Sequence, residues 1–158
     1  MVNVAHILKL AKAKKLTIGA VESLTGGLLL ATLTSVSGAS KVIKGGLVTY
    51  TREEKEKLLH ISHVKIAKYG VISEQVAFDM AKMGRYRLNV DICVALTGNA
   101  GPKVMEEKPR GLYYLAIATP HEVQVIEVIA AGTRTQIRRA CVTRALEELE
   151  NTLLKQVA

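Results

Sequence analysis

Short apolar segments alternate with amphipathic ones along the chain, and the apolar segments have the length of strands. Residues 16–21, LTIGAV, form a compact β-branched run, and residues 90–102, VDICVALTGNAGP, begin with a near-continuous apolar run typical of a strand covered on both faces. Residues 41–51, KVIKGGLVTYT, predict a strand with a bend at its glycine pair. The stretches GLYYLAIAT and VQVIEVIAA, separated by PHE, predict two adjacent antiparallel strands.

Apolar positions at helical spacing occur on both sides of these strands. Residues 23–35 predict a helix with Ser23 or Thr25 as its N-cap, and Ser73 is a natural N-cap for a later helix. The first helix has an apolar face made of Val4, Ile7, Leu8 and Ala11. The helix after Ser73 has a stripe made of Val76, Ala77, Met80 and Met83.

The order of acidic and basic residues predicts one more helix, and the spacing of apolar residues predicts the last one. Glu53 and Glu54 precede Lys55 and Lys57, as expected for the start of a helix. Residues 135–154 predict a long final helix, with the inward positions Ile137, Ala140, Cys141, Ala145, Leu146 and Leu149.

The order of these elements indicates the fold class. It runs helix, strand, helix, strand, helix, helix, three strands and a helix. Such alternation predicts an α/β fold, a three-layer α/β/α sandwich with a mixed, mostly parallel central sheet. No internal repeat and no linker rich in proline and glycine interrupts the chain, so residues 1–158 are expected to form a single domain.

Composition indicates what builds the core and in which compartment the protein is expected. Hydrophobic residues make up 49% of the 158 residues and aromatic residues only 4%, so aliphatic side chains must build the core. No apolar run approaches the roughly 18 residues that span a bilayer, and no secretory signal is evident, so no membrane partner is expected. The lysine-bearing start fits a first helix better than an organellar transit peptide. Cys93 and Cys141 lie in apolar segments, which favours reduced thiols in a cytoplasmic protein.

The net charge of +8 favours anionic partners. The basic residues are scattered, and no aromatic residues interleave with them as a stacking platform for nucleic acid would require. A small phosphorylated ligand, or solubility alone, explains the charge without nucleic acid.

Three short polar elements follow predicted strands and form the candidate site. The first is Glu22 to Gly27, ESLTGG, the second is Val48 to Thr51 with Lys55 close behind, and the third is Thr97 to Pro102, TGNAGP. Ligands of α/β sheets bind beyond the carboxyl ends of parallel strands, where such loops meet. Free backbone amides at these positions would also donate hydrogen bonds to an oxyanion or a phosphate.

Other familiar motifs do not fit. VESLT lacks the glycines of a nucleophile elbow, and neither a P-loop nor a dinucleotide-binding glycine motif occurs. Ser62 and Lys65 match S-x-x-K without its companion motifs. His60 and His63 have helical spacing but no third ligand nearby, which favours a solvated helix end over a metal site.

At these polar elements the sequence resembles the CinA C-terminal domain family, the nicotinamide-nucleotide amidohydrolases. The family pattern is roughly A-E-S-C-T-G-G, G-x-V-x-Y-x-x-x-x-K, [ST]-G-I-A-G-P and E-K-P-x-G, with G-A-V-S-E-x-V-x-x-M-A before the third motif. The matching stretches are VESLTGG (21–27), GLVTYTREEK (46–55), GVISEQVAFDMA (70–81), TGNAGP (97–102) and EKPRG (107–111). They cover nearly the whole chain in order.

The resemblance implies hydrolysis of the carboxamide of nicotinamide mononucleotide to nicotinic acid mononucleotide and ammonia, without a metal or other cofactor. It implies that Ser23 is the nucleophile, that Lys55 is its base, and that Tyr50 relays or orients the proton. It further implies a homo-oligomer. The substrate-binding residues that it implies are Glu22, Thr25, Gly26, Gly27, Thr49, Thr97, Gly98, Ala100, Gly101 and Arg134.

Each role has an alternative in the residues themselves. Ser23 is also a helix cap, Lys55 lies in the solvated-looking REEKEK, and Tyr50 suits a strand end. Glu22 is expected to hold its loop by accepting backbone N–H bonds. Arg134 and Arg138 resemble the family's G-x-R-x-x-[IV]-R and suit either a phosphate or a subunit contact.

The chain also departs from the family pattern. Leu24 replaces the usual Cys, Asn99 replaces the usual Ile, and residues 103–106 have lost the family's glycines. Because glycine adopts positive φ at no cost, this loop is expected to take another path. The alternative hypothesis is therefore a catalytically weakened relative that binds nucleotides or a competence-linked partner.

Overall fold

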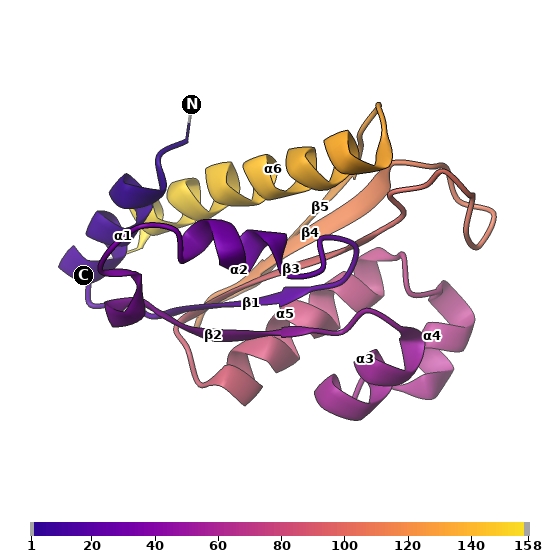
Figure 1. The fold of residues 1–158 in the computed structure, drawn as a ribbon. Helices are drawn as coiled ribbons and strands as arrows, with labels where there is room; N and C mark the ends of the chain where they lie inside the picture. Colours follow the sequence, from indigo (N-terminus) through magenta and orange to yellow (C-terminus); the bar gives the residue numbers. More distant parts are fainter. Residues whose placement is uncertain (1, 157–158) are drawn as a thin grey trace.

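The computed structural model describes residues 2–156 as a five-stranded sheet with helices on both faces (Figure 1). The strands are β1 (Ile18–Glu22), β2 (Ile43–Val48), β3 (Ile92–Gly98), β4 (Leu112–Ala118) and β5 (Val123–Ile129), and their order is β2-β1-β3-β4-β5. β2, β1 and β3 pair in parallel, whereas β4 is antiparallel to both β3 and β5. Four strands thus share one direction, which confirms the α/β sandwich with a mixed sheet.

The helices divide between the two faces of the sheet. One face carries α1 (Val4–Ala13), α2 (Leu28–Leu33) and α6 (Arg134–Lys155), and the other carries α3 (Arg52–Leu59), α4 (His63–Tyr69) and α5 (Glu74–Leu88) (Figure 1). A short 3-10 helix, η1 (Ala39–Lys41), precedes β2. Within residues 2–156, none of the helices is both long and apolar enough to cross a membrane.

The central strand β3 explains why its sequence is apolar throughout. Ile92, Val94 and Leu96 pack in the core under α1, α2 and α6, while Cys93 and Ala95 pack in the core under α5. A strand between two helical layers has no solvent-facing side, so its sequence cannot alternate with polar residues.

Close packing of α5 on the sheet depends on a glycine. A Cβ at Gly84 would meet Cγ2 of Val21 and would lie 2.8 Å from Sγ of Cys93. Only a glycine therefore lets α5 approach β1 and β3 this closely, which explains a helix-weakening residue inside a long helix.

Three details of the predicted helices are wrong. The helix expected over 23–35 begins only at Leu28, because Gly26 (φ 57°) and Gly27 (φ 105°) form a left-handed turn that no α-helix contains. The helix α4 was not expected; Ser62 accepts the Lys65 amide as its N-cap, so the S-x-x-K match is capping chemistry. In α6, Ala140 is exposed and Val142 takes the buried position.

Candidate active site at the ends of β1, β2 and β3

The three polar elements meet at one edge of the sheet. β1, β2 and β3 are parallel neighbours, so the segments that follow their carboxyl ends lie together. Between them is a cavity of about 100 Å³. Its lining residues are Ser23, Leu24, Tyr50, Lys55, Val71, Thr97, Gly98, Asn99, Ala100, Met105 and Arg134.

The central contact of the cavity joins Lys55 and Ser23. Nζ of Lys55 donates to Oγ of Ser23 at 2.8 Å and to the carbonyl oxygen of Thr49 at 2.7 Å. Lys55 is 1% exposed and Ser23 is 6% exposed. Ser23 does not cap α2, since Gly27 holds that position without a side-chain bond. The hydroxyl and the amine are therefore within direct proton-transfer distance in a site that largely excludes water.

The position of Lys55 on α3 explains its burial. Thr51 is the N-cap of α3, and its hydroxyl accepts the Glu54 amide. Lys55 shares the inner face of this helix with Leu59 four residues later, and these two are its buried residues. The segment REEKEK thus has a solvated face with one lysine turned inward.

Burial changes the acid–base chemistry of this lysine. Loss of hydration disfavours the ammonium form and lowers the pKa of Lys55 from 10.5 to about 8, while the negative charge of Glu106 acts in the opposite direction. A lysine with such a pKa can lose its proton near neutral pH and accept one from a neighbouring hydroxyl.

Glu22 and Arg138 fix the turn that carries Ser23. The Glu22 carboxylate, which is fully buried, accepts the amides of Gly27 (3.2 Å), Leu29 (2.9 Å) and Leu30 (3.0 Å). These bonds satisfy the N-terminal amides of α2 and confirm that Glu22 holds its loop.

From the other side, the Arg138 guanidinium donates to the carbonyl oxygens of Leu24 and Thr25, both at 2.9 Å. Gly26 donates its own amide to the Ser23 carbonyl at 3.0 Å. The amides of Gly26 and Gly27 are therefore already occupied, and neither glycine lines the cavity. Thr25 is buried outside the lining, and its hydroxyl has no partner within residues 2–156.

The end of β3 forms another wall of the cavity. Oγ1 of Thr97 donates to the Val71 carbonyl at 2.8 Å. Oδ1 of Asn99 accepts the Gly101 amide at 3.0 Å, while its Nδ2 is buried and has no partner in the described part of the chain. The Ala100 amide likewise donates to no group within residues 2–156. This wall therefore presents polar donors that the protein itself does not use.

Tyr50 and Arg134 lie at the mouth of the cavity. The guanidinium of Arg134 donates to the Tyr50 hydroxyl at 3.0 Å and to the Gly101 carbonyl at 2.6 Å. Tyr50 is 55% exposed. The atom of Tyr50 that Oγ of Ser23 contacts is the backbone carbonyl oxygen, at 3.5 Å, and not the side-chain hydroxyl. The hydroxyl of Thr49 is buried, and it has no partner in the described chain either.

Three residues of the site were not expected from the sequence. Val71 and Met105 line the cavity, and Glu106 influences Lys55, but none of them belongs to a recognisable polar element. Their contributions depend on the path of a loop, which leaves no periodic signal. Among residues 2–156, no three His, Cys, Asp or Glu side chains are grouped so that they could hold a metal ion.

Comparison with known proteins places the chain in a family. A family model described as the CinA C-terminal domain matches residues 3–153. The chain belongs to the CinA C-terminal domain family. It is 42% identical over 140 residues, 88% of its length, to a Streptococcus pyogenes protein (serotype M2, strain MGAS10270) named as a competence-damage inducible protein. Those residues are 33% of that protein, so the chain spans about a third of the length of the curated relatives it matches.

Solved structures of this family share the architecture. The competence/damage inducible protein CihA from Agrobacterium tumefaciens is 35% identical, with a TM-score of 0.91 over 96% of this chain and 93% of that chain. A CinA superfamily protein from Escherichia coli is 28% identical, with a TM-score of 0.89 over 93% and 88% of the two chains. One from Klebsiella pneumoniae, at 23% identity, has the same fold, with a TM-score of 0.92 over 98% and 99%.

Proposed function

We propose that this CinA-family chain is an amidohydrolase that converts nicotinamide mononucleotide and water to nicotinic acid mononucleotide and ammonia. The observation that supports it most is the 2.8 Å bond between the buried Lys55 amine and the Ser23 hydroxyl. A serine attacks an amide only when a base takes its proton, and a desolvated lysine is such a base.

In the first half of the reaction, neutral Lys55 takes the proton from Ser23, and Oγ bonds to the carboxamide carbon. The tetrahedral oxyanion is stabilised by backbone amides that have no acceptor within residues 2–156. Leu24 and Ala100 line the cavity and carry such amides. One donor of this kind contributes about 3 kcal/mol to lowering the barrier.

In the second half, the carbon–nitrogen bond breaks, and the amine takes the proton from the Lys55 ammonium and departs as ammonia. Water then attacks the Ser23 ester and gives its proton to Lys55. The ester bond breaks, the Ser23 oxygen regains that proton, and the acid product is released. No step uses a metal.

The rest of the nucleotide extends from the cavity past Tyr50 and Arg134. A cavity of about 100 Å³ encloses only the reacting end of such a ligand. Tyr50 is exposed beside it and offers a ring face, and Arg134 offers a positive charge to the phosphate. Self-association and a cytoplasmic location belong to the same proposal.

Ammonia release from nicotinamide mononucleotide by the purified chain tests this function. Wild type is expected to turn over, whereas Ser23→Ala and Lys55→Ala are each expected to lose at least about a thousandfold in kcat. Thr51→Ser, which keeps the α3 cap, serves as a control with unchanged activity. Turnover that survives Ser23→Ala would exclude the serine as nucleophile.

A nucleotide-binding role without turnover is the second candidate, and the loop over residues 103–106, which has lost the family's glycines, favours it. An inert wild type whose melting temperature still rises with the mononucleotide would support that role, because a ligand selective for the native state stabilises it. Oligonucleotide binding that falls steeply with salt would instead indicate a nucleic-acid partner.

A further inference from the structure

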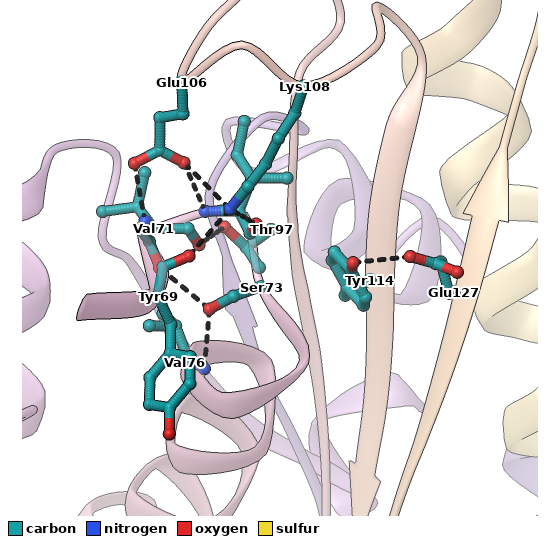
Figure 2. Close-up of polar contacts among 11 residues, drawn as sticks. Tyr69, Val71, Ser73, Val76, Thr97, Glu106, Lys108, Tyr114 and Glu127 are labelled. Atoms are coloured by element: carbon teal, nitrogen blue, oxygen red, sulfur yellow. Dashed lines mark hydrogen bonds and ion pairs between the residues drawn. The ribbon is translucent and has the colours of Figure 1, made fainter. Parts of the chain in front are cut away.

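The loop between β3 and β4 is fastened to the turn between α4 and α5. The Glu106 carboxylate accepts the amides of Val71 (2.9 Å) and Ile72 (3.1 Å). Nζ of Lys108 donates to the carbonyl oxygens of Tyr69 (2.8 Å) and Ile72, and it lies 3.5 Å from Oε1 of Glu106 (Figure 2). Amides and carbonyls of one turn are thus held by opposite charges from one loop; we call these contacts the Glu106 clamp.

The clamp requires unusual backbone on both sides. Glu106 (φ 54°) and Glu107 (φ 58°) both adopt left-handed conformations, which are costly for residues with a side chain, and they form the tip between the bridged residues Met105 and Lys108. On the facing turn, a Cβ at Gly70 would lie 2.6–2.8 Å from the Glu106 carboxyl group. The left-handed backbone at Glu106 and Glu107 and the glycine at position 70 are therefore all required for the contact between Glu106 and the turn.

The clamp also determines the wall of the active-site cavity. Met105 and Val71 both line the cavity; Val71 donates its own amide to Glu106, and Met105 directly precedes Glu106. Val71 is held on its other side by Thr97, whose hydroxyl donates to the Val71 carbonyl (Figure 2). Release of Glu106 would leave Val71 held only through its carbonyl and the loop after Met105 fastened only by Lys108, so the cavity wall depends in part on this carboxylate.

We propose that Glu106 is a positioning residue of the active site, which holds Met105 and Val71 as the cavity wall. The effect of Glu106 on catalysis rests on the proposed amidohydrolase function. Its effect on the shape of the cavity and on the charge of Lys55 does not. The negative charge of Glu106 also favours the ammonium form of Lys55 and so raises its pKa, against the larger effect of burial.

The charged groups around Lys55 include Glu106, whose carboxylate is itself paired with Lys108 at 3.5 Å. The carboxylate of Glu22, at the end of β1, accepts three amides, and the guanidinium of Arg138 from α6 donates to two carbonyls. Arg134, also from α6, and Tyr50, after β2, line the same cavity and are bonded to each other. Of these groups, Glu106 is the one whose charge opposes the effect of burial on the Lys55 pKa.

Two variants remove the charge and differ in what they leave of the clamp. Glu106→Gln keeps one acceptor oxygen for the two amides of the turn, and Glu106→Ala keeps none. Glu107→Gln is the matched control, because Glu107 has the same left-handed backbone and its carboxylate forms no hydrogen bond or ion pair within residues 2–156.

The first measurement follows the Lys55 pKa directly, by NMR titration of protein labelled at the lysine side chains, with Lys55→Met to assign the signal. In Glu106→Gln the pKa of Lys55 is expected to fall below that of wild type. Hydrogen exchange is the second measurement, and in Glu106→Ala the amides of Val71 and Ile72 are expected to exchange at least about tenfold faster. Glu107→Gln is expected to match wild type in both.

Kinetics with nicotinamide mononucleotide complete the test. Glu106→Gln is expected to shift the rising limb of the pH–kcat/KM profile to lower pH, and Glu106→Ala to lower kcat/KM by about ten- to a hundredfold. A residue that only stabilised the fold would lower the melting temperature without moving the pH profile.

The outcomes distinguish this inference from the proposed function. An unchanged Lys55 pKa together with unchanged exchange at the turn would overturn the role of Glu106, whatever the activity. A shifted pKa and faster exchange in a protein that releases no ammonia would support the clamp and contradict the amidohydrolase.

Discussion

Lys55 reaches from the first turn of α3 to Ser23 just after β1, and its amine lies 2.8 Å from the serine oxygen. The two residues are 32 positions apart in the chain, and both are buried. A buried amine is costly when charged and useful as a base when neutral. The contact that suits the site for chemistry therefore also destabilises the fold at neutral pH.

Lys55→Met is expected to stabilise the protein at pH 7. Below pH 8, Lys55 is protonated in both the folded and unfolded states, so the folded state bears the whole cost of the buried charge. A difference between 10.5 and about 8 corresponds to about 3 kcal/mol. Losing the hydrogen bonds to Ser23 and Thr49 offsets about 2 kcal/mol of this, so a net gain of about 1 kcal/mol is expected.

The sign of this effect depends on pH. Between pH 8 and 10.5 the unfolded chain binds a proton that folded Lys55 does not, so the free energy of unfolding of wild type rises with pH. Urea unfolding at pH 10 is therefore expected to show Lys55→Met as the less stable protein. Lys57→Met, at an exposed position of α3, should show neither effect, and an advantage of Lys55→Met that persisted at pH 10 would contradict the burial argument.

Activity is expected to rise with pH through a pKa of about 8. Ser23 loses its proton only to neutral Lys55, whose fraction increases tenfold per unit below that pKa. The measurement is kcat/KM for ammonia release between pH 6 and 9.5. A profile that is flat over this range would show that the titration of Lys55 does not control the rate.

Glu22→Gln is expected to destabilise the protein by about 2 kcal/mol. The carboxylate is buried and accepts three amides, whereas glutamine offers one oxygen and turns an NH₂ group toward N–H donors. Urea unfolding at pH 7 measures this loss. Glu53→Gln, at an exposed position in the first turn of α3, is the matched control, and equal losses in the two variants would rule out a special role for Glu22.

Arg138→Ala is expected to lower kcat about tenfold and stability by about 1–2 kcal/mol. Its guanidinium fixes the Leu24 and Thr25 carbonyls, so its loss lets the turn that carries Ser23 move. Arg139→Ala removes an exposed neighbour that forms no side-chain hydrogen bond or ion pair within residues 2–156. Kinetics and thermal unfolding of both variants decide the matter: an Arg138→Ala protein with wild-type kcat would show that the turn keeps its shape without the arginine.

The order of helices and strands was predictable from the sequence because the pattern of each element depends on neighbouring residues. β3 is apolar on both faces, Ser73 caps α5, and β4 and β5 pair across a short connection, all as the sequence indicated. The start of α2 was misplaced for an equally physical reason. Ser23 and Thr25 are good caps by type, but the left-handed glycines after them delay the helix, and Glu22 caps it from the preceding strand.

The sequence by itself determined the periodicities, the caps and the polar loops after the strands, because these follow from the conformations and solvation of neighbouring residues. Only the tertiary structure decided that one lysine of REEKEK is buried, that Arg138 binds a turn 113 positions away, and that Glu106 binds the turn between α4 and α5. Burial and charge proximity depend on what packs over a residue, and that partner comes from a distant part of the chain. The chemistry of Ser23 and Lys55 therefore belongs to the folded protein, although each residue is visible in the sequence.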